Sequence, residues 1–145
     1  MKIVRAIGVV LWTVGICLAP HQAAAAGKYD GSVPLLCVPL AVTECGAEGE
    51  CQKGTPRSVN LPQFFRVDLK AMTIRAVEES RESPIKTVDR VNGNLILQGV
   101  QGQRGWTLII SEEVGQMSAT IGAPAEGYII FGSCTPLGQG QVQGQ

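Results

Sequence analysis

The chain of 145 residues has very little histidine, and its one copy, His21, lies near the start of the sequence. It also has no net charge, because 12 basic residues balance 12 acidic ones. Without an excess of positive charge, the chain lacks the overall basic field with which proteins hold nucleic acid. No apolar run reaches 18 residues, which argues against a multi-pass membrane protein. Hydrophobic residues nevertheless make up 45% of the chain, too many for a wholly disordered protein.

The start of the chain has the pattern of a secretory signal peptide. Two basic residues precede 14 almost wholly apolar ones, 6–19, and an alanine run, 23–26, follows. This order predicts a signal peptide over 1–26, cut after Ala26 with Ala25 as the alternative, and a periplasmic or secreted location. An uncleaved anchor is disfavoured because 14 residues span about 21 Å as a helix, short of a hydrocarbon core of about 30 Å.

Cleavage after residue 26 would remove the only histidine. The remaining 119 residues would carry ten basic and twelve acidic side chains. Without histidine, neither a Ser-His-Asp site nor a Cys-His site can form, and a His-ligated zinc site is excluded as well. Ser111 and Ser133 have no histidine to activate them, and neither is followed three positions later by the lysine that an S-x-x-K motif requires. We therefore expect no enzyme, no catalytic residue, no metal site and no cofactor.

The cysteine count agrees with export. Loss of Cys17 with the signal peptide leaves four cysteines, and an even number in an exported domain predicts two disulfide bonds. Three pairings are possible. We favour Cys45–Cys51, across a short glycine-containing loop, together with Cys37–Cys134, which would join the first strand to the last. The alternative of a four-cysteine metal site lacks the usual C-x-x-C spacing.

Alternating apolar and polar residues dominate the rest of the chain. A single β-domain is expected over 33–137, between a flexible N-terminus, 27–32, and a disordered Gly/Gln tail, 138–145. The alternation predicts about eight strands, of which seven fall within 64–134. The expected fold is an all-β antiparallel meander that closes, or nearly closes, into a small barrel, because closure removes edge strands. A β-sandwich is the alternative.

Local signals refine this prediction. Asn92-Gly93 is typical of a type I′ hairpin turn between two strands. Pro39 lies inside the first expected strand, 35–43, where it indicates an edge or a bulge. Residues 45–63 contain several turn signals and are expected to form a long connection.

Several short motifs carry a resemblance to a known set of proteins. They cover about residues 64–121 and consist of Val67-Asp68-Leu69 with Thr73-Ile74, then Ile85 and Val88 with Leu95 and Leu97, then Trp106-Leu108-Ile110-Ser111 with Gly115 and Met117. Their order resembles uncharacterised exported proteins of proteobacteria, and the resemblance implies a small periplasmic β-domain without a known activity. The general plan also resembles periplasmic inhibitors of lysozyme or proteases, whose inhibitory residues do not map onto this chain.

One acidic loop is the leading candidate for a binding site. Glu44, Glu48 and Glu50 crowd the segment that Cys45 and Cys51 are expected to clip. A disulfide-clipped loop loses little entropy on binding, and its charge would speed encounter with a basic partner. The leading hypothesis is therefore an exported binding protein of the cell envelope, an inhibitor or adaptor for another envelope protein. The simpler interpretation is a solvated loop without a function.

A second hypothesis places the site inside the barrel. Large residues of the later strands could line a cavity for a small apolar ligand, as in eight-stranded carriers: Trp106, Met117, Tyr128, Ile130 and Phe131. The simpler interpretation here is a barrel filled by its own side chains. A third hypothesis is a structural envelope protein without a discrete site. None of the three involves nucleic acid or stable insertion into a membrane after signal cleavage.

Overall fold

The computed structural model describes residues 28–138, which form nine antiparallel strands and no helix. The strands are β1 Leu35–Gly46, β2 Cys51–Gly54, β3 Phe65–Asp68, β4 Thr73–Ala76, β5 Glu82–Val91, β6 Asn94–Gln101, β7 Arg104–Ser111, β8 Gln116–Ala123 and β9 Glu126–Pro136. The expected signal peptide, 1–26, and residues 139–145 of the expected tail lie outside the described residues.

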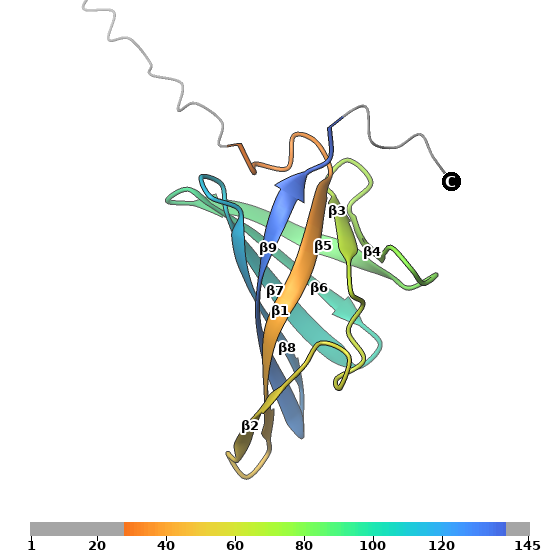
Figure 1. The fold of residues 1–145 in the computed structure, drawn as a ribbon, viewed down its shortest axis with the longest axis vertical. Coiled ribbons are helices and arrows are strands. Elements are labelled where there is room, and N and C mark those ends of the chain that lie inside the picture. The colour runs from red at the N-terminus through yellow and green to blue at the C-terminus, as the bar shows by residue number, and fades with distance from the viewer. Residues whose placement is uncertain (1–27, 139–145) are drawn as a thin grey trace, which may run out of the picture.

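Eight of these strands close into a barrel, as the alternation predicted (Figure 1). From β3 to β9 each strand pairs with the next strand of the chain. The barrel closes where β1 pairs with β9, from Leu35↔Pro136 to Gly46↔Glu126. The prediction of a small antiparallel barrel is therefore confirmed, and the β-sandwich alternative is discarded.

The first strand, β1, has two partners on its other edge. Its beginning pairs with β3, through Leu35↔Val67 to Cys37↔Phe65, and its end pairs with β2. The register with β9 shifts between Pro39 and Ala41, which confirms the bulge expected at the proline. Proline has no N–H to donate, so in a regular ladder the carbonyl opposite it would lack a donor. The register shift at this point avoids that loss.

The extra strand, β2, corrects the sequence prediction, which treated 45–63 as one long connection. Its residues, Cys-Gln-Lys-Gly, contain no alternating apolar side chains that could announce a strand. It forms because the chain turns back on β1, with Cys45 opposite Cys51, and pairs through Val42↔Gly54. In Figure 1 this hairpin extends the sheet at the bottom of the view, beyond the ends of β3 and β4. We call this the β2 end of the barrel.

The opposite end of the barrel is filled. Large inward side chains pack there around the Cys37–Cys134 pair, and the fully buried ones include Leu35, Leu95, Leu97 and Ile110. Burial of one such side chain contributes about 1.5–3 kcal/mol. The segment 28–34 lies across this end, including the described part of the expected flexible N-terminus, 27–32. The Tyr29 backbone N–H donates to the Glu112 carbonyl at 3.0 Å, and the Tyr29 ring packs on the core.

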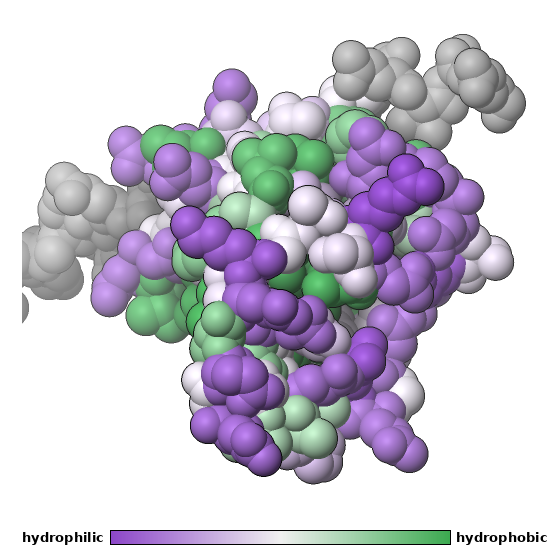
Figure 2. All heavy atoms as spheres, turned by 60° about the horizontal axis from the view of Figure 1, so that its bottom comes forward, coloured by the Kyte–Doolittle hydropathy of each residue, from purple (hydrophilic) through white to green (hydrophobic). Residues whose placement is uncertain are grey.

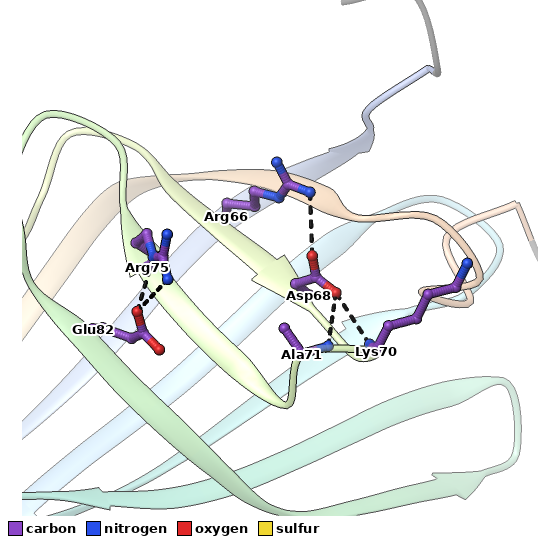
Figure 3. Close-up of polar contacts among 6 residues, drawn as sticks. All are labelled: Arg66, Asp68, Lys70, Ala71, Arg75 and Glu82. Atoms are coloured by element: carbon purple, nitrogen blue, oxygen red, sulfur yellow. Dashed lines mark hydrogen bonds and ion pairs between the residues drawn. The ribbon is translucent and has the colours of Figure 1, made fainter. Parts of the chain in front are cut away.

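Turn residues fit the backbone that each turn requires. Asn92 and Gly93 both have positive φ, 50° and 76°, between β5 and β6, as the type I′ prediction required. Asp68 organises the turn between β3 and β4 (Figure 3). Its Oδ1 accepts the backbone N–H groups of Lys70 at 3.1 Å and Ala71 at 3.0 Å.

Charged pairs cover the outer face of β3, β4 and β5. Asp68 also pairs with Arg66 at 3.2 Å, and Arg75 Nε donates to Glu82 at 2.9 Å across β4 and β5 (Figure 3). The hydrogen bond from the Ala71 N–H, with the Arg66 charge beside it, lowers the pKa of Asp68 below its ordinary value of 3.8. These groups therefore stabilise the turn with Asp68 ionised.

Both disulfide bonds are the pairings favoured from the sequence. Cys37–Cys134 joins directly opposed residues of β1 and β9, 97 positions apart in the chain, and Cys45–Cys51 joins opposed residues of β1 and β2, six positions apart. Each bond therefore links β1 to one of its neighbours. Two intramolecular disulfide bonds indicate folding in an oxidising environment.

The two bonds should differ in their contribution to stability. Because the Cys37–Cys134 loop is far longer, the chain-entropy treatment gives about 4–5 kcal/mol for it and about 2–3 kcal/mol for Cys45–Cys51. We expect the double variant Cys37→Ala/Cys134→Ala to lose about twice as much free energy of unfolding in urea as Cys45→Ala/Cys51→Ala. Equal losses would contradict the idea that barrel closure is what the longer link stabilises.

Asp68 should make stability depend on pH in the acid range. Its folded-state pKa is lowered, so its contribution is present above the unfolded value and is lost as the pH falls through the folded value. We expect Asp68→Ala to reduce the free energy of unfolding by about 1–2 kcal/mol at pH 7. The gap between this variant and the parent should narrow towards pH 2. Asp89→Ala, at an exposed position of β5, is the matched control; a gap for Asp68→Ala that stays constant with pH would refute the role of its charge.

Candidate functional site

The β2 end of the barrel contains a cavity of about 120 Å³ that is partly open to solvent. Its lining is largely apolar and comes from β1 and from all strands from β3 to β9, together with the connection between β2 and β3. The apolar lining residues are Pro39, Leu61, Pro62, Phe65, Ile74, Ala76, Trp106, Leu108, Met117, Ala119, Ile121 and Ile130. Figure 2 shows the molecule with this end turned forward, where green apolar side chains are visible between purple hydrophilic ones.

The cavity exists because small side chains occupy several inward positions at this level. Ala76, Ser83 and Ala119 line it, whereas the fully buried side chains of the filled end are larger and include Leu35, Leu95 and Ile110. Large residues on the other strands do not fill the remaining space. The barrel is therefore packed at one end and hollow at the other, which a count of inward apolar residues does not reveal.

One hydrogen bond fixes the largest side chain of the cavity wall. The Trp106 Nε1–H donates to Ser83 Oγ at 2.8 Å, and Ser83 is 7% exposed. Gly99 lies opposite Trp106 in the ladder, and a Cβ at this position would collide with the indole ring. The glycine therefore lets the ring lie across β6, where Ser83 of β5 satisfies its polar edge.

The connection between β2 and β3 covers one side of the cavity. Leu61 and Pro62 contribute its lining, and the preceding turn is closed by the Leu61 N–H donating to the Pro56 carbonyl at 2.8 Å. Arg81 anchors this segment by donating to the Asn60 carbonyl at 2.6 Å, and it also pairs with Glu79 at 2.6 Å. The charge of Arg81 is thereby neutralised by a carboxylate of the same protein.

Polar side chains continue the same inner faces just beyond the cavity. Tyr128 stands opposite Ile121 of the cavity wall on one side and opposite Glu44 on the other. Its hydroxyl donates to Glu126 Oε2 at 2.9 Å and lies 3.5 Å from Glu44 Oε1. Arg104 pairs with Glu126 and lies 5.8 Å from the centre of the Tyr128 ring.

The electrostatic environment of Tyr128 is negative. The hydrogen bond to Glu126, together with burial and the charges of Glu126 and Glu44, raises the pKa of Tyr128 above its ordinary value of 10.0. Arg104 acts in the opposite direction but is the smallest of these influences. Glu126 itself has a lowered pKa, because it accepts hydrogen bonds from Tyr128 and Arg104. The phenol is therefore neutral at physiological pH, and the field around it favours a positive charge.

The structure separates the three glutamates of the acidic loop. Glu48 and Glu50 are exposed at the tip between β1 and β2, whereas Glu44 is half-buried on β1 against Tyr128. None of the three takes part in the five ion pairs found within residues 28–138. The contact role expected for these residues as one acidic finger stays a prediction.

The cavity residues expected from the sequence are divided as well. Trp106, Met117 and Ile130 line the cavity, as the carrier hypothesis required. Phe131 does not, because it points outward from β9 and is 54% exposed, and Tyr128 lies just beyond the cavity. The middle of β9 is apolar on both faces, so its sequence does not indicate which residues point inward. Ser83 was missed, since its partner Trp106 lies 23 positions away.

No protein family model, no curated protein and no solved structure matches this chain. The resemblance to exported proteobacterial proteins therefore stays a prediction, and the site rests on geometry alone. Within residues 28–138, no three His, Cys, Asp or Glu side chains gather in a way that could hold a metal ion. The same part of the chain contains no helix long and apolar enough to cross a membrane.

Loss of the Ser83 hydroxyl should loosen the cavity wall. In Ser83→Ala the Trp106 N–H loses its partner in a half-buried position, which costs about 1–3 kcal/mol of unfolding free energy. Urea unfolding checks the loss, and the indole N–H resonance of Trp106 should shift towards a solvent-exposed value. Ser83→Thr keeps the hydroxyl and should retain most of the stability; an equal loss in both variants would point to packing instead of the hydrogen bond.

Proposed function

We propose that the protein is an exported binding protein that takes a small apolar ligand into the cavity at the β2 end. The single observation that carries this proposal is the hollow, apolar interior beside Trp106, in a barrel whose other end is packed. Of the roles expected from the sequence, the carrier of an apolar ligand is the one that this geometry favours. An inward cavity lined by apolar and aromatic side chains is the usual form of such a site.

The size of the cavity limits the ligand. An apolar cavity of about 150 Å³ in another protein takes one benzene molecule, and the cavity here measures about 120 Å³. A single aromatic ring or a short branched alkyl group fits this volume, whereas a polycyclic molecule does not. The ligand is thus a small molecule with one such group, or a larger one that inserts a single ring.

The location is part of the same proposal. Two disulfide bonds agree with an oxidising compartment, and the signal pattern over residues 1–26 favours the periplasm or the exterior of the cell. A partly open, apolar cavity would there be accessible to ligands from the surroundings. The protein would bind and release them without chemical change.

Filling the cavity should abolish binding. We expect 2-phenylethanol to bind the purified, disulfide-bonded protein in a titration followed by calorimetry, and Ala119→Phe to lose this binding because the new ring occupies the cavity. Ala119→Leu fills it with a smaller side chain and should weaken binding by about tenfold or more, a loss of about 1.4 kcal/mol.

Thr120→Phe is the matched control, because it introduces the same ring on the exposed position next along β8. It should bind like the parent. If the parent protein does not bind, or if the two phenylalanine variants behave alike, the cavity is not a ligand site and the proposed function fails. Circular dichroism of each variant shows whether the barrel is intact.

A further inference from the structure

Two residues that neither line the cavity nor complete the core lie directly beside its wall. Tyr128 is the ladder partner of Ile121, a cavity residue, and Glu44 is the ladder partner of Tyr128. Residues opposite one another on the same face of a sheet have Cβ atoms about 4.5–5.5 Å apart. A ligand with its apolar group in the cavity would therefore reach the Tyr128 hydroxyl and the Glu44 carboxylate through a short chain.

The arginines around the cavity are already neutralised. Arg81 pairs with Glu79 and with the Asn60 carbonyl, and Arg104 pairs with Glu126. An anionic ligand would have to displace one of these carboxylates. The cavity lining also includes Glu82, whose carboxylate is engaged by Arg75.

Glu44 differs from the other carboxylates near the cavity. Within the described residues, the one hydrogen-bond contact of its carboxylate is the Tyr128 hydroxyl, at 3.5 Å. A phenol has a single proton to donate, and Tyr128 gives it to Glu126 at 2.9 Å. Glu44 is half-buried as a residue, and the described residues leave most of the acceptor capacity of its carboxylate unused.

We propose that the ligand of the cavity is an amine: its apolar group fills the space beside Trp106 and its ammonium group binds Glu44, with the Tyr128 hydroxyl oxygen as a second acceptor. This inference rests on the proposed function and names the chemical class of the ligand. An ammonium group supplies three N–H donors, enough for both acceptors. A neutral alcohol would bind only through the apolar group, and a carboxylate would meet repulsion from Glu44.

Three compounds that differ only in their polar end test the proposal: 2-phenylethylamine, 2-phenylethanol and phenylacetate. Calorimetric titration of the disulfide-bonded protein at pH 7 should give the tightest binding for the amine, about fivefold tighter than the alcohol, as expected for one partly exposed charge pair. Phenylacetate should bind more weakly than the alcohol. In Glu44→Gln the affinity for the amine should fall to that for the alcohol, and the affinity for the alcohol should not change.

Glu48→Gln is the matched control, because it removes the same charge from the exposed tip of the β1–β2 hairpin and should keep the preference for the amine. If the alcohol binds but the amine binds no better, or if Glu48→Gln and Glu44→Gln reduce the preference equally, the inference is wrong while the proposed function stands. If none of the three compounds binds, the proposed function fails as well.

Discussion

The pairing of β1 with β9 is the interaction on which the rest of the structure depends. Every other pairing in the barrel joins strands that are neighbours in the chain, or nearly so, whereas this one brings Leu35 opposite Pro136. It converts an open meander into a closed sheet, and closure removes two edges that would otherwise expose unpaired backbone groups. It also encloses the interior, so both the packed core and the cavity exist only in the closed form.

Closure has a further effect on the composition of the site. The end of β1 continues beyond the bulge at Pro39 and carries Glu44 to the strand that holds Tyr128. These two residues are 84 positions apart in the chain. The polar groups beside the cavity are therefore assembled by the same pairing that closes the barrel. An error in the register of β1 against β9 would turn Glu44 away from Tyr128.

Much of the fold could be predicted from local patterns. Inward positions of a small barrel must be apolar, so the alternation over residues 64–134 announced seven strands, and Asn92-Gly93 announced a turn that only residues tolerant of positive φ can form. β2 could not be found in this way, because its four residues form a strand only through their partner on β1. The disulfide pairing followed from spacing and from the expectation that the first and last strands meet.

Three residues of the cavity wall could be named from the sequence, but whether the barrel is hollow could not be decided from it, for a different physical reason. The volume of the cavity depends on how far small residues such as Ala119 stand from the large ones opposite, and that distance is set by the stagger of the strands around the barrel. The sequence contains both the small and the large residues but not their relative height. For the acidic segment, the sequence shows the negative charge directly. The different surroundings of Glu44 and Glu48 follow only from the three-dimensional structure.

The position of two cysteines on one strand has a consequence for oxidative folding. Cys37 and Cys45 both lie on β1, and Cys134 is the last cysteine that a ribosome would deliver. Until then Cys37 has only wrong partners. Once β1 is extended, however, its two cysteines are about 26 Å apart at about 3.3 Å per residue, so they cannot join. Early formation of the β1–β2 hairpin would thus protect Cys37 from mispairing until Cys134 has been synthesised.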